Sequence, residues 1–407
     1  MSNVLATSSI VSKIALAIIK NNLGFAKNVN RDWQDEFTGN MERGYAPGTT
    51  INIRKPPRYT YRAGRVAVPQ ATVEQTVPLT LSQGGNDIAF TSLERTLSLT
   101  RLEDKIMAAI APVTNEIDRQ GLALAHYSTY NTLNGTPGNG ALPTTSALAI
   151  QAVTQMGQRL DEMGAPRDRG GRTIVTNPAL NAALVQGFGG FFNNPSKISS
   201  QFDTGMLSDS FGFNSAMDQN VDVHTNGAAT ATNINGANQT GSNITVVAVA
   251  GGTLTRGTTI TLPGVFAVNP QSRVSTGQLA NFVVTADVLV GATTIPVSPA
   301  LVTSGAFQNV SASPTTGQPY VIQGAASTSY ATNIAYHKDA FTLAMVPMFA
   351  PPSGKGNVSV SQQTEDGMTV KVTEYYDAIN DVMGMRFDVL FGWAATYPEL
   401  STKYYTV

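Results

Sequence analysis

The chain has 407 residues, a formal net charge of −1 and no cysteine. This length is enough for two or three domains. The balanced charge argues against a dedicated nucleic-acid-binding protein, and the lack of cysteine excludes a disulfide framework and a thiolate metal site. Charged residues make up only 13% of the chain, about half of the usual share. A surface with so few charges suits packing against neighbouring subunits, so the composition favours an assembly.

The first predicted element is a short amphipathic helix that ends before Gly24. Ile10, Ile14 and Ile18 recur every four residues, behind two serines that suit a helix cap. Two interpretations stay open for this apolar face: the helix docks on its own domain, or it forms an arm that reaches a neighbouring subunit. The apolar run is shorter than the about 20 residues that cross a bilayer, and no signal-peptide pattern surrounds it. We therefore expect no membrane partner.

A basic β-ribbon follows, because residues 43–73 contain no acidic residue and alternate apolar and aromatic side chains. A second strand-like stretch runs into Gly84, Gly85 and Asn86, for which we predict a turn. Together the two stretches predict one long hairpin-like excursion. Its basic face suits nucleic acid, solvent, or acidic groups of neighbouring subunits. The residues that we assign to inter-subunit contact are Arg54, Lys55, Arg58, Arg62 and Arg65.

The strongest helix pattern covers residues 100–128, where apolar residues follow in steps of three and four. Thr100 and Glu103 make a capping box at its start, and Pro112 is expected to kink it. One face of this helix should be buried, so we interpret it as the spine of a domain.

An α+β region comes next. A second amphipathic helix ends at Gly164, which tolerates the left-handed conformation of a helix cap. The stretch RTIVT then predicts a strand, and Asn177 with Pro178 begins another short helix. The Gly-rich residues 187–192 follow this helix rather than a strand, and we predict a flexible loop there instead of a phosphate-binding loop.

Residues 226–337 predict a β-domain inserted into a host domain. They contain only three charged residues, and in residues 253–287 β-branched and aromatic residues alternate between turn signals. This pattern predicts short antiparallel strands. Beyond the insert the chain is again strand-like, so we expect the host domain that begins near residue 130 to finish near the C-terminus.

No catalytic, cofactor-binding or metal-binding residue is predicted, and the chain is not expected to be an enzyme. His126, His224 and His337 lack any partner motif. His224 and His337 flank the insert and are expected to face each other, where they suit either a polar strand border or a metal-binding or pH-sensing pair. We interpret paired carboxylates such as Asp161 and Glu162 as side chains on solvent-exposed faces.

The order of these parts resembles the major capsid (coat) proteins of tailed, short-tailed-type double-stranded DNA phages. The group that is most similar is that of the P-twenty-two-type coat proteins, which carry an inserted β-barrel domain. The stretches that carry this resemblance are residues 15–33, 48–62, 172–178, 264–287, 335–344 and 389–400. The resemblance implies an α+β fold, the tailed-phage (Hong Kong phage-like) major capsid fold.

The resemblance also implies a division of the chain. Its parts are an N-terminal arm (1–42), an extended β-hairpin loop (43–90), a peripheral domain with the spine helix (91–130), an axial domain (131–225 and 338–390), an inserted β-barrel (226–337) and a C-terminal return to the peripheral domain (391–407). In this scheme the arm docks through Ile10, Ile14 and Ile18.

The function implied by the resemblance is self-assembly into pentamers and hexamers of the icosahedral shell around the phage genome. A scaffolding protein would guide a procapsid that expands on packaging. Further implied partners are a portal protein, the packaged DNA through weak non-specific contacts, and decoration proteins. The protein would be assembled in the host cytoplasm and reside in the virion. The alternative is another virion or surface structural protein, such as a tail or adhesin component.

Overall fold

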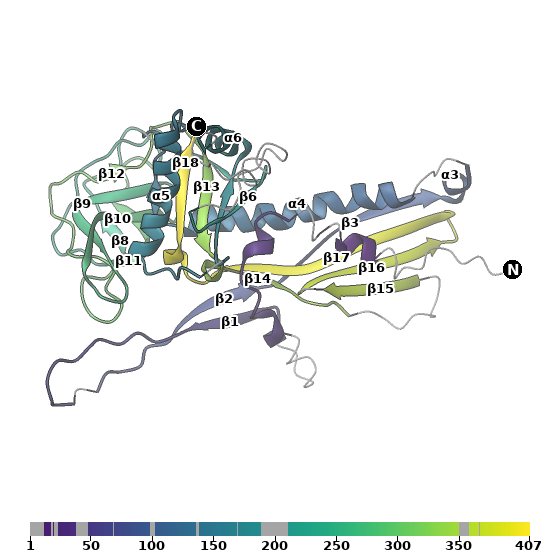
Figure 1. Ribbon diagram of the computed structural model, residues 1–407, viewed down its shortest axis with the longest axis horizontal. Coiled ribbons are helices and arrows are strands. Elements are labelled where there is room, and N and C mark those ends of the chain that lie inside the picture. The colour runs from purple at the N-terminus through teal and green to yellow at the C-terminus, as the bar shows by residue number, and fades with distance from the viewer. Residues whose placement is uncertain are drawn as a thin grey trace. The chain divides into compact units, whose positions relative to one another are not determined.

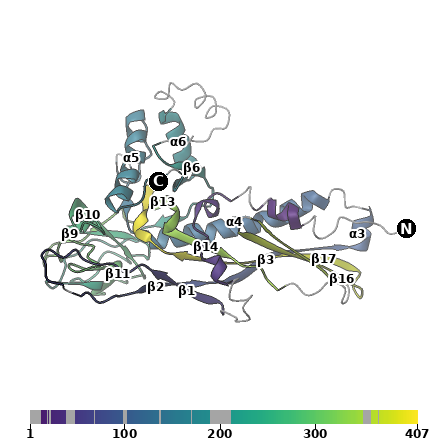
Figure 2. The ribbon, with the colours of Figure 1, turned by 60° about the horizontal axis from the view of Figure 1, so that its bottom comes forward.

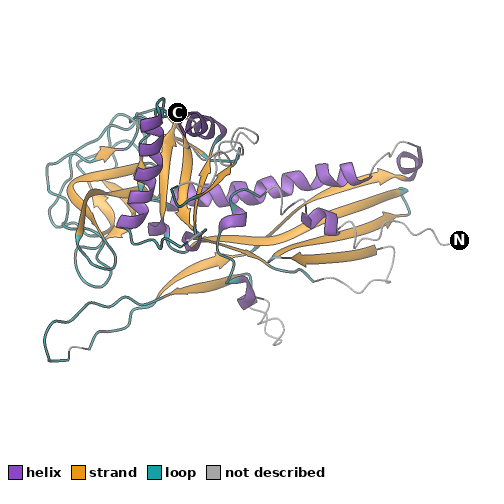
Figure 3. Ribbon diagram, viewed as in Figure 1, coloured by secondary structure: helices purple, strands orange, loops and turns teal. Residues whose placement is uncertain are grey.

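The computed structural model is a mixed α+β structure with several sheets and few helices (Figure 3). The chain forms two compact units, one of residues 1–53, 76–121 and 342–394 and one of residues 54–75, 122–341 and 395–407. The structure describes residues 12–17, 19, 23–37, 48–67, 69–97, 102–135, 138–168, 170–188, 211–349, 358–365 and 367–407.

The first unit is organised around one long strand, β17, which pairs with β16 on one side and with β3 on the other (Figure 1). The β3–β17 pair is antiparallel and runs without a break from Thr91 opposite Val382 to Ser82 opposite Phe391. The elements that lie wholly or mostly in this unit are η1 (Ala26–Asn28), β1 (Thr50–Lys55), β2 (Gln75–Thr80), β3 (Ser82–Thr91), α3 (Ser92–Leu97), α4 (Leu102–Ser128), β14 (Phe341–Met345), β15 (Val358–Glu365), β16 (Met368–Asp377) and β17 (Val382–Ala395).

The turn predicted at Gly84–Asn86 is wrong, because these residues lie inside strand β3. The two glycines do not bend the chain there. A Cβ atom on Gly85 would lie 2.2 Å from the backbone oxygen of Phe387 on β17. The glycine therefore permits a close approach of two backbones, which is the other common reason for glycine in a strand.

The second unit contains a six-stranded sheet in the order β4-β18-β13-β5-β6, with β7 also paired to β13. Helices α5 and α6 pack on this sheet and on each other (Figure 2). Its elements outside the insert are β4 (Thr132–Leu133), α5 (Ser146–Glu162), β5 (Arg172–Thr176), α6 (Pro178–Phe188), β6 (Asn214–Met217), β7 (Val223–Thr225), β13 (Ser329–His337), η2 (Lys338–Ala340), η3 (Pro398–Leu400) and β18 (Ser401–Thr406).

The helix predictions for this unit are confirmed. Helix α5 ends just before Gly164, which has a φ of +77°. The side chain of Asn177 accepts a hydrogen bond from the backbone N–H of Leu180 at 2.9 Å and so caps α6. The predicted loop at 187–192 is wrong for Gly187 and Phe188, which belong to α6, because Gly187 lets α6 approach Ala149 of α5. Residues 189–192 lie outside the described residues.

The insert forms a five-stranded sheet in the order β12-β9-β10-β11-β8, with its own core of aliphatic side chains. Antiparallel pairing of β9 with β10 confirms the predicted hairpins. A closed barrel is not confirmed. Residues 232–235 hydrogen-bond to residues 317–320, just before β12, and to residues 245–247, at the end of β8, through isolated bridges and without forming a named strand. The strands are β8 (Gly241–Thr245), β9 (Thr259–Val268), β10 (Ser275–Val284), β11 (Thr294–Leu301) and β12 (Val321–Ile322).

Three strand placements differ from the sequence prediction. Strand β13 was expected in the insert but pairs with β5 and β18 in the six-stranded sheet. Strands β14–β17 were expected to complete the sheet of residues 131–225 but lie in the first unit, because β17 pairs with β3 over ten residues. Strand β18, in the segment 391–407 that we expect to return to the peripheral domain, lies between β4 and β13 in the six-stranded sheet. Periodicity locates strands, whereas the choice of partner depends on packing that no local pattern records.

Candidate functional site

The N-terminal segment is anchored to its own spine helix by a buried carboxylate. Asp118 of α4 is 1% exposed and accepts hydrogen bonds from the backbone N–H groups of Gly24 at 2.7 Å and Ala26 at 2.8 Å. The ring of Phe25 packs on Trp393 with centroids 5.3 Å apart. Sequence reasoning missed this anchor, since a single Asp on a helix carries no signal of a distant partner.

The apolar face that we predicted for docking is only partly described. Ile10 and Ile18 lie outside the described residues, and Ile14 is half-buried. The buried residues of the helical stretch 12–17 and of position 19 are Ser12, Ala15, Leu16 and Ile19. The inter-subunit role of the predicted face stays a prediction.

The root of the extended loop is held by its own chain. Arg58 makes an ion pair with Glu399 at 2.7 Å, and its guanidinium lies 6.0 Å from the centre of the Phe307 ring. Lys55 lies 5.1 Å from the centre of the Tyr397 ring. These contacts join the loop to the insert and to the C-terminal segment within the second unit. We call this set of contacts the root clamp.

The insert contributes a direct hydrogen bond to the root clamp. Arg273, in the turn between β9 and β10, donates to the carbonyl oxygen of Tyr59 at 2.7 Å. A cavity of about 300 Å³ lies beside these residues, lined among others by Lys55, Arg58 and Tyr130. Burial lowers the pKa of Lys55 even though Glu399 opposes this shift. The same burial raises the pKa of Tyr130, so this phenol stays protonated near neutral pH.

The rest of the loop is exposed but keeps a defined shape. The side chain of Gln70 accepts from the backbone N–H of Thr60 at 2.8 Å and donates to the Thr60 carbonyl at 2.7 Å. Tyr61 is 92% exposed and Val66 78% exposed. Of the five basic residues predicted for inter-subunit contact, Lys55 and Arg58 therefore belong to the root clamp. Arg54, Arg62 and Arg65 are exposed, and Arg62 donates to the carbonyls of Gly64 and Val66.

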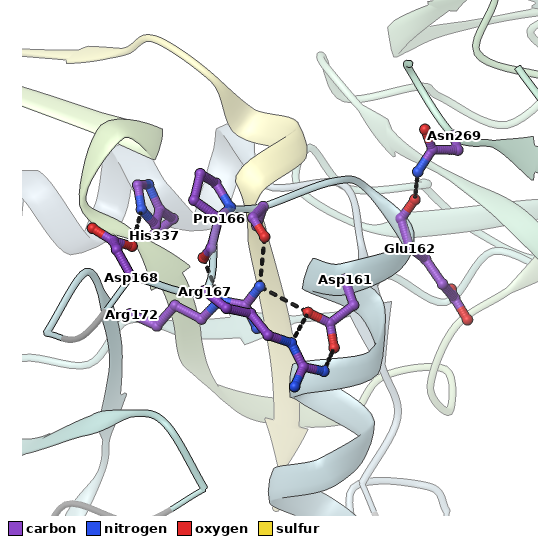
Figure 4. A network of polar contacts seen from close by, with 9 residues as sticks. Asp161, Glu162, Pro166, Arg167, Asp168, Arg172, Asn269 and His337 are labelled. Carbon is purple, nitrogen blue, oxygen red and sulfur yellow. Dashed lines mark hydrogen bonds and ion pairs between the residues drawn. The ribbon is translucent and has the colours of Figure 1, made fainter. Parts of the chain in front are cut away.

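A second polar network fixes the connection from α5 to β5 (Figure 4). Arg172 is buried and donates to Asp161 at 2.8 Å and to the carbonyl of Ala165 at 2.6 Å. Arg167 binds the same carboxylate, and together the two arginines lower the pKa of Asp161. Asn269 of the insert donates to the carbonyl of Glu162 at 2.8 Å. The carboxylate of Asp161 is thus a structural ion-pair partner, not the merely solvated group that we predicted.

The histidines do not form the pair that we predicted at the borders of the insert. His224 lies opposite Tyr330 on β13, whereas His337 lies opposite Arg172, seven residues further along the same strand. His337 instead contacts Asp168 at 2.8 Å. The described part of the chain contains no group of three or more side chains that suits a metal ion, and none of its helices is long and apolar enough to span a bilayer.

Comparison with known families decides the identity of this architecture. Residues 100–402 match the family model described as P22 coat protein, gene protein 5, which covers well over half of the chain. The chain belongs to the P22 coat protein family. No curated protein matches this coat protein. The family result favours the shell subunit over the alternative of a tail or adhesin component.

A solved phage structure shares the fold of this coat protein. A structure from Mycobacterium phage Che8 is 11% identical, with a TM-score of 0.51, over 94% of this chain and 91% of that chain. The capsid structure of cyanophage P-SCSP1u is 10% identical, with a TM-score of 0.42, over 88% of this chain and 84% of that chain. The predicted α+β Hong Kong phage-like capsid fold is confirmed. This coat protein is a major capsid protein of the virion and assembles with copies of itself into the icosahedral shell.

Proposed function

We propose that this coat protein builds its shell by placing the exposed part of the extended loop against a neighbouring subunit. In this arrangement Arg54, Arg62 and Arg65 meet acidic groups of the neighbour, and the root clamp holds the base of the loop on its own subunit. The observation that carries the proposal is the contrast within the loop: Lys55 and Arg58 contact distant residues of their own chain, whereas Arg54, Arg62 and Arg65 are exposed and Arg62 donates to carbonyls of the loop itself.

The exposed part of the loop has the properties of an unfilled interface. Tyr61 and Val66 present apolar surface beside guanidinium groups, and exposed apolar patches with polar rims mark interaction sites. The hydrogen bonds between Thr60 and Gln70 hold the loop in shape before it binds. A loop that is already ordered loses less conformational entropy on binding, which raises the affinity.

The basic residues act as a group. One exposed ion pair is worth only about 0.2–1 kcal/mol. A head-to-tail contact that is repeated around a closed shell multiplies such weak contributions, while each contact remains reversible during assembly. Removal of one arginine should therefore weaken assembly slightly, and removal of three should weaken it severely.

The remaining partners that we propose follow from the family likeness. A scaffolding protein guides a procapsid in the host cytoplasm, the shell expands as DNA is packaged, and a portal protein occupies one vertex. DNA contacts the inner surface weakly and without sequence preference, in keeping with a net charge near zero. Decoration proteins bind the outer surface. The role of the subunit is structural and it catalyses no reaction.

The proposed division of labour within the chain keeps the predicted names. Residues 1–42 serve as the arm, residues 43–90 apart from β3 as the extended loop and residues 226–337 apart from β13 as the accessory domain. The spine helix and its strands serve the peripheral part, and the six-stranded sheet serves the axial part.

The test is assembly of a triple variant, Arg54→Ser with Arg62→Ser and Arg65→Ser, co-expressed with the scaffolding protein. Electron microscopy and light scattering should show soluble subunits in place of closed shells. The matched control removes three exposed basic residues elsewhere, through Lys27→Ser, Lys105→Ser and Arg119→Ser, and should still form shells. Normal shells from the loop variant would refute the proposed contact.

A further inference from the structure

Three basic side chains are buried together where the insert joins the six-stranded sheet. His126 lies in the last turn of α4, His224 on β7 and Lys403 on β18, and their exposed fractions are 0%, 4% and 0%. The rings of His126 and His224 have centroids 4.9 Å apart. The Nζ atom of Lys403 lies 3.2 Å from the carbonyl oxygen of His126. We call these three residues the basic cluster.

The basic cluster holds one loop of the insert. Lys403 donates to the carbonyl of Gly257 at 3.4 Å, and Nε2 of His224 lies 3.1 Å from the hydroxyl oxygen of Thr258. A Cβ atom on Gly257 would lie 2.6 Å from Nε2 of His126, so the loop backbone packs directly on that imidazole. The segment at 255–258 therefore covers all three basic groups.

No carboxylate of the described residues neutralises the cluster at close range. Within the described residues, no carboxylate lies within ion-pair distance of any of its members, and neither ring nitrogen of His126 has a hydrogen-bond partner. Asp222, beside β7, is half-buried, and its charge raises the pKa of Lys403 against the effect of burial. The other groups that face the cluster are Arg256 from the insert, Tyr127 from α4, and Tyr405 and Tyr330 from β18 and β13.

We infer that the basic cluster is an acid-sensitive latch, which holds the loop at 255–258 closed while its two imidazoles are neutral and releases this loop when they take up protons. Protonation turns both nitrogens of His126 into donors, for which this fully buried site offers no acceptor among the described residues. Water can reach them when the loop at Gly257 moves away. Protonated His224 would add a like charge 4.9 Å from the first ring, measured between centroids, which favours the same movement.

The pH range follows from the direction of the shifts. Burial and the charge of Lys403 lower the pKa of His224 from 6.5 to about 4, and burial lowers that of His126 well below 6.5. The open state binds protons below pH 6.5 while the closed state does not, so closure is weakened as the pH falls from 6.5 to about 4. Burial lowers the pKa of Lys403 from 10.5 to about 7. The open state therefore binds a proton on Lys403 in this range while the closed state does not, so closure also weakens as the pH falls from 10.5 to about 7.

Hydrogen exchange of the full-length chain tests the latch. Two backbone hydrogen bonds report on it, from Gly257 to Val284 at 2.8 Å and from Val284 to Thr258 at 2.9 Å. After correction for intrinsic exchange, the opening constant at these amides should rise about tenfold per pH unit for each histidine that titrates, between pH 6.5 and 4. Amides of β5, Arg172–Thr176, serve as the internal reference and should not change over this range.

The variants separate the latch from general acid sensitivity. His126→Phe combined with His224→Gln should abolish the acid-induced rise of the opening constant at Gly257 and Val284. Lys403→Met should remove the dependence of this constant on pH between 10.5 and 7. The control His337→Gln removes a buried histidine outside the cluster and should keep the rise. A wild-type chain without the rise, or a double variant that retains it, overturns the inference.

One measurement does not depend on the folding of a variant. Titration of the imidazole resonances in the wild-type chain should give a pKa near 4 for His224, and a value near 6.5 overturns the inference.

Discussion

The buried carboxylate of Asp118 is the strongest test of how the N-terminal segment is held. It accepts two short hydrogen bonds, from the backbone N–H groups of Gly24 and Ala26, and Ala26 is fully buried. A hydrogen bond to a charged group contributes about 1.5–3 kcal/mol, so the pair is worth about 3–6 kcal/mol. Asp118→Ala should lower the stability of this anchor by that amount.

Hydrogen exchange measures this loss at the amides concerned. A loss of 3–6 kcal/mol corresponds to an opening constant about two to four orders of magnitude larger at Gly24 and Ala26. Asp118→Asn keeps one acceptor oxygen, so its opening constant should lie between those of Asp118→Ala and the wild type. Urea denaturation of unassembled subunits provides the second readout, since the anchor joins the segment to α4.

The same helix offers a matched control. Glu116 lies two residues before Asp118, is partly exposed and pairs with Arg119 only one turn away. Glu116→Ala removes a carboxylate at a neighbouring but more exposed position of the helix and should change the free energy of unfolding by no more than about 0.5 kcal/mol. If Asp118→Ala exchanges no faster than Glu116→Ala at Gly24 and Ala26, the carboxylate does not hold the segment and our reasoning is wrong.

Two further predictions concern the packing of each unit. Gly85→Ala should cost about 1–3 kcal/mol and lower the Tm, because its Cβ would meet the backbone oxygen of Phe387 at 2.2 Å, whereas Gly84→Ala, with its nearest contact at 3.7 Å, should fold normally. Equal Tm values for the two variants would contradict the close approach of β3 and β17. Asp161→Asn should cost about 1–3 kcal/mol at pH 7 by removing the partner of buried Arg172. Since Arg167 and Arg172 lower the pKa of Asp161 below 3.8, its stabilisation is present above pH 3.8 and is lost as the pH falls through the lowered value. Urea denaturation at pH 7 and at a series of pH values below 3.8 should show the variant and the wild type converging in acid, and a constant difference would contradict the ion pair.

The extended loop shows which of its properties the amino-acid composition predicts and which it does not. Its lack of acidic residues was visible in the sequence and predicted a basic surface. The separation of Lys55 and Arg58 from Arg54, Arg62 and Arg65 was not visible, because the partners of the root clamp come from residues about 250 and 340 positions away. Sequence distance of this size leaves no local pattern.

Lys403 illustrates a different limit. Its strand, Ser401–Thr406, is buried at every position, although it contains mostly polar residues. A strand in the middle of a sheet with both faces covered shows no alternation of apolar and polar residues, so periodicity could not reveal its burial. The sequence therefore offered no sign of the basic cluster, which α4, β7, β18 and the insert build together.

The amino-acid sequence by itself determined the helices at α4, α5 and α6, the positions of most strands, the uncharged insert and the family of the protein. These features rest on local periodicity, caps and the order of segments, all of which are written along the chain. Only the tertiary structure decided that β17 pairs with β3, that β13 and β18 share one sheet, and that Asp118 and Arg58 bind distant backbone and side-chain groups. Pairing of that kind is selected by the burial of whole surfaces and by the need to satisfy buried polar groups, and both depend on all parts of the fold at once.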